Sequence, residues 1–223
     1  YARAEKLARH KDKEAAAEFE VLKKLKEAFE NEKPARSVEF SKEEKKAVHH
    51  LHLLTMKPVL YVANVAEDEV ADSENNPNVK KVKEYAADEG AEVVVISAKI
   101  ESEIAELDGE EKEGFLQDLG IPESGLDQLI RASYDLLGLA TYFTAGEPEV
   151  RAWTFRNGMK APQAAGIIHT DFERGFIRAE VVSYDDLIAA GSMAAVRDEG
   201  KLRLEGKEYV VRDGDVIHFR FNV

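Results

Sequence analysis

Apolar residues recur at helical spacing in the first part of the chain. One face of this pattern carries four large side chains: Phe19, Leu22, Leu25 and Phe29. Asp12 stands where an N-cap is needed, and Pro34 ends the pattern. Residues 1–10 show a shorter helical pattern with no capping residue ahead of it. We therefore predict an antiparallel helical hairpin over residues 1–50, and we expect its first arm to continue before Tyr1.

The middle of the chain alternates between helical patterns and short apolar runs. Ser41 and Glu44 form a capping box, which predicts a helix that runs to about Leu54. The runs at residues 59–64 and 92–96 are almost continuously apolar, which is typical of buried parallel strands. Further helices are predicted at four places: residues 78–89, 102–107, 110–118 and a segment opened by Ser124. Strand, helix and strand in close succession make a βαβ unit.

From Leu139 the pattern changes to short alternating segments separated by turn residues. Five strands are predicted here: residues 150–156, 176–182, 201–204, 209–212 and 216–221. A short helix is predicted over residues 162–169. A mixed sheet of four or five strands around one helix is the β-grasp pattern. The predicted fold class is therefore α/β, with a hairpin (1–50), an α/β segment (51–138) and a β-grasp domain (139–223).

The charge of the chain is concentrated in its middle. The net charge of the 223 residues is -13. Residues 1–50 carry +2, residues 51–139 carry -13 and residues 140–223 carry -2. An acidic protein binds nucleic acid poorly without specific contacts, so we expect no DNA partner. The chain has no apolar run long enough for a membrane span and no cysteine, which favours a reducing, cytoplasmic location.

Two polar loops follow the two predicted parallel strands. Residues 64–67 (Asn-Val-Ala-Glu) follow the first strand, and residues 97–99 (Ser-Ala-Lys) follow the second. Ligands of open α/β sheets bind beyond the carboxyl ends of the strands. P-loop GTPases carry their base-recognition motifs, Asn-Lys-x-Asp and Ser-Ala-Lys, at these two places. An ordinary polar strand exit for the first loop, and a helix N-cap for Ser97, are the alternatives.

The first loop departs from the guanine motif in a way that has a chemical meaning. The Asp of the standard motif accepts hydrogen bonds from two guanine N–H donors. Here Val65 replaces the Lys, and Glu67, one methylene longer, replaces the Asp. Adenine has no 2-amino donor and presents an acceptor at N1, so it gains little from a carboxylate. We therefore expect this loop to have lost guanine preference.

The altered motif resembles that of the YchF/Obg-like ATPase family. The resemblance extends over most of the chain, through residues 64–67, 100–108, 115–120, 142–146, 149–153, 161–165, 169–173, 175–180 and 213–223. It implies a P-loop ATPase α/β domain with an inserted helical hairpin and a C-terminal TGS domain, of which this chain carries the later parts. It further implies ATP binding, with GTP possible, and Mg²⁺ held through the P-loop part.

The resemblance also implies particular site residues and partners. Asn64 helps to fix the base, the backbone of Val65 contacts adenine, and Glu67 lies at the same edge. Ser97 and Ala98 pack against the other side of the base. The implied partner is the ribosome, either its large subunit or the whole particle, together with RNA. We expect a monomer with no membrane partner and no metal ligands of its own, because His49, His50 and His52 spread around a predicted helix.

The chain differs from the family pattern in lacking a Walker A loop. No G-x-x-x-x-G-K-[ST] sequence occurs in the 223 residues, so no catalytic residue can be assigned. We expect the missing part to precede Tyr1, and we predict that the chain alone does not hydrolyse ATP. The competing hypothesis is a non-enzymatic adaptor, in which the hairpin and the TGS module bind RNA or protein.

Overall fold

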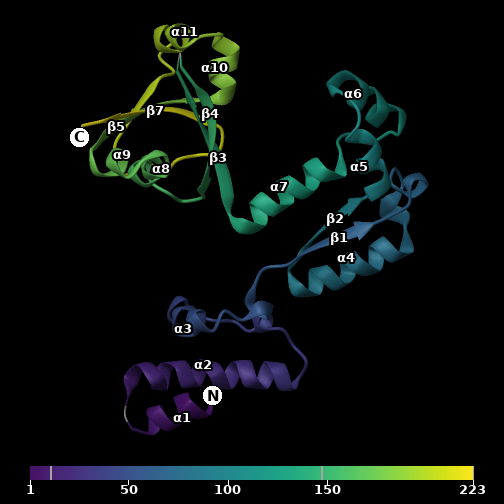
Figure 1. Ribbon diagram of the computed structural model, residues 1–223, viewed down its shortest axis with the longest axis vertical. Helices are drawn as coiled ribbons and strands as arrows, with labels where there is room; N and C mark the ends of the chain where they lie inside the picture. Colours follow the sequence, from purple (N-terminus) through teal and green to yellow (C-terminus); the bar gives the residue numbers. More distant parts are fainter. Residues whose placement is uncertain (11, 147, 223) are drawn as a thin grey trace. The chain divides into compact units, whose positions relative to one another are not determined.

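The computed structural model describes residues 1–10, 12–146 and 148–222, and they form two compact units, Tyr1–Ala132 and Ser133–Val223 (Figure 1). The three-part division at residues 50 and 138 stays a prediction. In the described residues, no helix has the length and apolar character that a membrane crossing requires. The helices and strands of the first unit are α1 (Ala2–Arg9), α2 (Lys13–Glu30), α3 (Lys42–Val48), β1 (Leu60–Asn64), α4 (Pro77–Glu89), β2 (Glu92–Ile96), α5 (Ala98–Ile104), α6 (Gly109–Asp118) and α7 (Gly125–Leu137), the last of which continues into the second unit.

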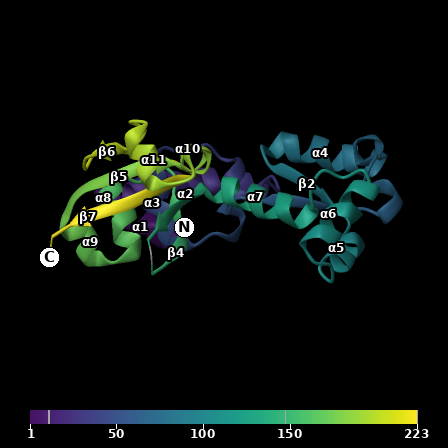
Figure 2. The same cartoon turned by 90° about the horizontal axis from the view of Figure 1, so that it is seen from above.

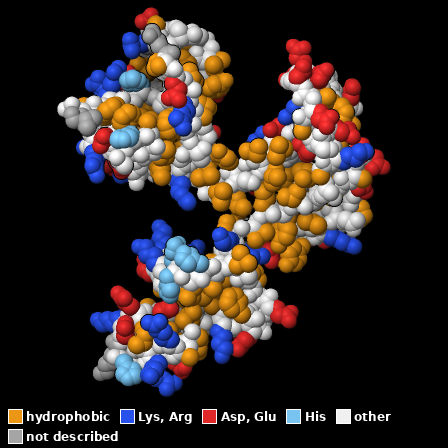
Figure 3. Space-filling model, in the orientation of Figure 1, with side chains coloured by type: hydrophobic (Ala, Val, Ile, Leu, Met, Phe, Trp, Pro, Cys, Tyr) orange, Lys and Arg blue, Asp and Glu red, His pale blue; other side chains and the backbone are white. Residues whose placement is uncertain are grey.

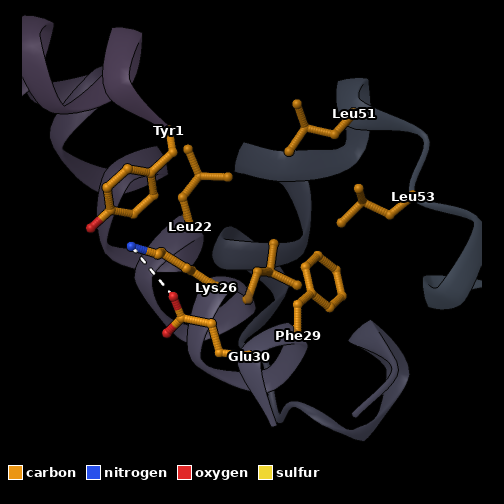
Figure 4. A pocket seen from close by; sticks show the side chains of 8 residues that line it. Tyr1, Leu22, Lys26, Phe29, Glu30, Leu51 and Leu53 are labelled. Atoms are coloured by element: carbon orange, nitrogen blue, oxygen red, sulfur yellow. Dashed lines mark ion pairs between the residues drawn. The ribbon is translucent and has the colours of Figure 1, made fainter. Parts of the chain in front are cut away.

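The N-terminal helices form the predicted hairpin (Figure 1). Asp12 caps α2 by accepting hydrogen bonds from the N–H groups of Glu14 and Ala15 at 3.0 and 3.1 Å. Four buried residues make the core between α2 and the segment that follows it: Val21, Leu25, Ala35 and Val48. A pocket of about 390 Å³ lies beside this core (Figure 4). Lys26 and Glu30 at its rim pair with each other, and the rest of its lining is mainly apolar.

The helix predicted to run to Leu54 is shorter than expected. The Ser41–Glu44 capping box is present, but α3 ends at Val48. A 3-10 turn over His49–Leu51 follows, and His52 has a left-handed φ of 46°, which an α-helix cannot continue through. The prediction was wrong at this end because a capping box fixes where a helix starts and says nothing of where it stops.

Strands β1 and β2 pair in parallel, with Leu60 opposite Glu92 and Asn64 opposite Ile96. This confirms two parallel strands, which α4 joins (Figure 1). The expectation that both strands are buried was wrong, because β1 has no buried residue and Val94 is the buried residue of β2. Helix α5 begins at Ala98, four residues before the predicted start at Ser102. The Ser102 hydroxyl instead donates to the Lys99 carbonyl within the helix, at 2.7 Å.

The second unit holds a five-stranded mixed sheet in the order β4-β3-β7-β5-β6. Strands β3 and β7 are parallel, and the other neighbours are antiparallel. Helices α8 and α9 pack on one face, while α10 and α11 cover part of the other (Figure 2). The elements are β3 (Leu139–Ala145), β4 (Val150–Arg156), α8 (Ala161–Ile168), α9 (Thr170–Arg174), β5 (Phe176–Ser183), α10 (Tyr184–Ala190), α11 (Met193–Asp198), β6 (Arg203–Glu205) and β7 (Asp215–Phe221).

The β-grasp prediction is confirmed in type and wrong in three details. One helix was predicted, whereas the unit also holds α9, α10 and α11. The strand β3 was not predicted, although it lies inside the sheet. The segment predicted as a strand at 209–212 makes only an isolated bridge, between Lys160 and Val210. Tyr142 and Phe155 fill the centre of the core, where the Tyr142 hydroxyl donates to the Ala164 carbonyl at 2.9 Å. Burial raises the pKa of Tyr142 well above its ordinary value.

Candidate nucleotide-base site

The two polar loops leave the sheet at the same edge because β1 and β2 are parallel and in register. The Val65 N–H donates to the Ile96 carbonyl at 2.9 Å, which extends the strand pairing by one residue. The Asn64 side chain then crosses to the second loop, where its Oδ1 accepts from the Ala98 N–H at 2.9 Å. Four of the predicted site residues are thereby brought together: Asn64, Val65, Ser97 and Ala98.

Ser97 carries the least expected feature of this edge. It is 3% exposed, and among the described residues its Oγ is buried without a hydrogen-bond partner. Ser97 occupies the N-cap position of α5, yet its side chain makes no capping hydrogen bond. A buried hydroxyl is normally paired, so the unpaired Ser97 hydroxyl is unusual among the described residues.

Glu67 lies at the start of the 3-10 turn Glu67–Glu69 and forms an ion pair with Lys99 of α5. The hydrogen bond from Lys99 to this carboxylate raises the pKa of Lys99. Both side chains are solvent-accessible, at 40% for Glu67 and 66% for Lys99. Glu67, the fifth predicted site residue, therefore reaches the same edge, and its carboxylate is paired with Lys99 there. Lys99 was absent from the predicted set, although it is the third residue of the Ser-Ala-Lys motif.

The start of helix α7 packs against α5 and β2 next to this edge. The Glu101 carboxylate accepts from the N–H groups of Gly125 and Leu126, at 2.7 and 3.2 Å, and so caps the start of α7. Gly125 lies so close to β2 that a Cβ there would stand 2.6 Å from Cγ2 of Ile96. Nothing in the sequence separates Glu101 from the other acids that follow it, so its role could not be predicted.

Amide, hydroxyl and backbone groups make up this edge. Across residues 1–10, 12–146 and 148–222, no group of three or more His, Cys, Asp or Glu side chains is placed to hold a metal ion. Acidic side chains do gather around α6 (Figure 3), where Glu110 and Glu111 lie in its first turn. The donor set at the β1–β2 edge, an amide, a hydroxyl and backbone groups, suits a heterocyclic base.

A parallel β1–β2 edge with these loops, followed by a β-grasp unit, defines the class: a P-loop NTPase α/β segment with a C-terminal TGS domain. Residues 139–222 match the family model YchF-GTPase_C, described as a protein of unknown function (DUF933). The chain is 73% identical to the ribosome-binding ATPase YchF of Bacillus subtilis (strain 168), over 99% of this chain and 60% of that protein. It is 56% identical to the Haemophilus influenzae protein of that name, over the same shares. The chain belongs to the YchF family.

Solved structures agree with this assignment. The Schizosaccharomyces pombe YchF GTPase matches with a TM-score of 0.81 and 35% identity, over 92% of this chain and 55% of that one. A GTP-binding protein from Pyrococcus horikoshii OT3 matches with a TM-score of 0.52 and 18% identity, which shows likeness of fold alone. The chain spans about 60% of the length of the curated relatives it matches.

Proposed function

We propose that this chain supplies the base-binding edge of a ribosome-associated nucleotide-hydrolysing protein that prefers ATP and accepts GTP more weakly. The hydrogen bond from the Ala98 N–H to Asn64 Oδ1 carries the proposal, because it joins the two loops that would flank a base. The curated relatives are named ribosome-binding ATPases, and the solved relative is named a GTPase, which supports nucleotide binding and ribosome binding for the complete protein.

Each residue of the edge has a defined part in this proposal. Asn64 has its oxygen engaged by Ala98, so its amide N–H₂ is the group that faces a ligand. The Val65 N–H is engaged by Ile96, which leaves its carbonyl to accept from the exocyclic amine of adenine. The Ser97 hydroxyl gains its missing partner when a base is bound. These residues bind and orient the base, and none of them takes part in phosphoryl transfer.

The phosphate-handling chemistry is assigned to residues outside this chain. Mg²⁺, when bound with ATP, neutralises charge on the phosphates during transfer to water. A Walker A loop would supply its cradle, and that sequence pattern does not occur here. We accordingly predict that residues 1–223 alone show no magnesium-dependent ATP turnover. Measured phosphate release above the uncatalysed rate from purified chain would contradict this.

The location and partners follow from the same proposal. We propose that the complete protein works in the cytoplasm as a monomer, bound to the large ribosomal subunit or the whole ribosome, with RNA and not DNA as its nucleic-acid contact. The nucleotide state would bias how the hairpin and the β-grasp domain meet the ribosome.

The test is nucleotide titration of a chain extended to the full length of the curated relatives. ATP should bind more tightly than GTP, and Asn64→Ala should weaken ATP binding about five- to tenfold, as expected for one lost hydrogen-bonding group. Asn78→Ala is the matched control, because Asn78 is exposed on α4 and should leave affinity unchanged. If neither ATP nor GTP binds at millimolar concentration, the proposal fails.

A further inference from the structure

The Glu67–Lys99 ion pair joins the two loops of the candidate base site a second time. The backbone of the site is already tied by Asn64 and Ala98, so this pair is not needed to hold the loops together. It instead places a cation directly on the carboxylate that occupies the base-reading position. Exposed ion pairs contribute little to folding stability, so the Glu67–Lys99 pair adds little to the stability of the fold. Its effect on the choice of ligand is therefore the role considered for it.

Glu69, in the same 3-10 turn as Glu67, is engaged elsewhere. Glu69 accepts from the Ala66 N–H at 3.2 Å and from the Asn76 side chain at 2.9 Å, which fixes the turn. Glu103, one turn further along α5, adds a weaker favourable charge to Lys99. Glu67 is therefore the acid that Lys99 contacts across the loops.

The charge on Glu67 decides which base edge it favours. An unpaired carboxylate attracts guanine, which offers N–H donors at N1 and at the 2-amino group. The same carboxylate repels the lone pair at N1 of adenine. A carboxylate whose negative charge is matched by an ammonium loses both effects, so adenine is tolerated and guanine gains less.

We infer that Lys99 is a positioning residue for base selectivity, which acts by neutralising Glu67 and thereby favours ATP over GTP. This inference rests on the proposed function and adds the residue that sets its preference. Adenine selectivity is accordingly a property of the pair of loops, and Glu67 alone does not account for it.

A double-mutant cycle in the full-length protein tests the inference. The four proteins are wild type, Lys99→Gln, Glu67→Gln and the double variant, and the readout is the ratio of ATP to GTP dissociation constants. Lys99→Gln should shift this ratio towards GTP by about two- to fivefold, the scale of an exposed ion pair. In the Glu67→Gln background, Lys99→Gln should leave the ratio unchanged, because no carboxylate remains to be released.

Two further variants separate selectivity from structure. Lys99→Arg keeps the positive charge, so this variant should have the same ratio of ATP to GTP dissociation constants as the wild type. Lys83→Gln removes another surface lysine paired to a glutamate, Glu74, and should not alter the ratio. Equal weakening of ATP and GTP by Lys99→Gln, or the same shift with Glu67 already replaced, would overturn the inference. Failure of wild-type protein to bind either nucleotide would instead overturn the proposed function.

Discussion

Ser97 illustrates how a residue can fit its fold poorly and its proposed ligand well. Its hydroxyl is buried and unpartnered among the described residues, and burial of an unpaired polar group costs free energy. Such costs concentrate at functional sites, where a ligand later supplies the missing partner. Asn64, Val65 and Ala98 supply the other groups of the proposed base site.

Replacing Ser97 should therefore raise stability and lower affinity. We predict that Ser97→Ala increases the free energy of unfolding of the ligand-free chain by about 1 kcal/mol, because an unsatisfied buried hydroxyl is removed. In the full-length protein the same change should weaken ATP binding. Urea unfolding and nucleotide titration measure the two effects. Ser41→Ala is the control: Ser41 caps α3 by accepting from the Glu44 N–H at 3.1 Å, so its loss should destabilise by about 1 kcal/mol. A destabilised Ser97→Ala would show that the hydroxyl is satisfied.

Gly125, which lies next to this edge, has no room for a larger side chain. A methyl group there would lie 2.6 and 2.9 Å from two atoms of Ile96, closer than packed carbons tolerate. Gly125→Ala should therefore lower the free energy of unfolding by about 1–3 kcal/mol, the usual cost of overpacking. Gly114→Ala in α6 meets nothing within 4 Å and should instead stabilise by about 0.5–1 kcal/mol, as alanine does within a helix. Equal effects of the two substitutions in urea unfolding would contradict this account.

The residues of the site differ in how far the sequence could identify them. Asn64, Val65, Ser97 and Ala98 could be placed together because two apolar runs predicted parallel strands, and parallel strands send their carboxyl ends to one edge. The Glu67–Lys99 pair depends on how two loops bring their side chains to one another, which no periodicity records. The contact of Glu101 with α7 joins segments 24 residues apart and depends on packing alone.

Elements were predictable where their own residues fix them. The cap at Asp12 and the box at Ser41 set the starts of α2 and α3, because a cap acts locally. The strand β3, in contrast, depended on distant partners. β3 is defined by pairing with β4 on one side and β7 on the other. The segment around Val210 has strand-like residues but forms only an isolated bridge to Lys160, which lies outside the sheet, so the alternating pattern gave a wrong prediction there.

One cluster links elements of the first unit and should respond to pH. The Glu89 carboxylate at the end of α4 accepts from Arg36 at 3.0 Å and from the Tyr61 hydroxyl at 2.8 Å. Hydrogen bonding from Arg36, and then from Tyr61, lowers the pKa of Glu89 below its ordinary value of about 4.5. A lowered carboxyl pKa stabilises the folded state at pH above the unfolded value, and this stabilisation is lost as pH falls through the folded value.

The stability difference between wild type and Glu89→Gln should therefore be largest near pH 7 and shrink on acidification below about pH 4.5. Urea midpoints measured from pH 7 to pH 3 give this difference directly. Glu84→Gln, on the exposed face of α4, provides the comparison and should differ little from wild type at every pH. A difference for Glu89→Gln that stays constant over the whole range would show that its hydrogen bonds do not depend on its charge.

At the scale of the whole molecule, the chain divides into two units, and each has hydrophobic clusters of its own. In the second unit, the buried residues of the sheet close around Tyr142 and Phe155 without help from residues 1–132. A second, smaller cluster forms where α10 and α11 meet Val182 and Val216. The acidity of the chain belongs mainly to the other unit, so the two parts present different surfaces to any common partner.

A fragment of residues 133–223 should accordingly fold alone. We expect a single cooperative transition in thermal and urea unfolding, because the fragment keeps the sheet, both of its helical covers and the hydrogen bond from Tyr142 to Ala164. Phe155→Ala should lower its free energy of unfolding by about 3–5 kcal/mol, since the ring is 2% exposed and its removal leaves a cavity. Val150→Ala, at a side chain that is 75% exposed, should cost far less. A gradual transition, insensitive to Phe155→Ala, would mean that this core forms only with residues 1–132 attached.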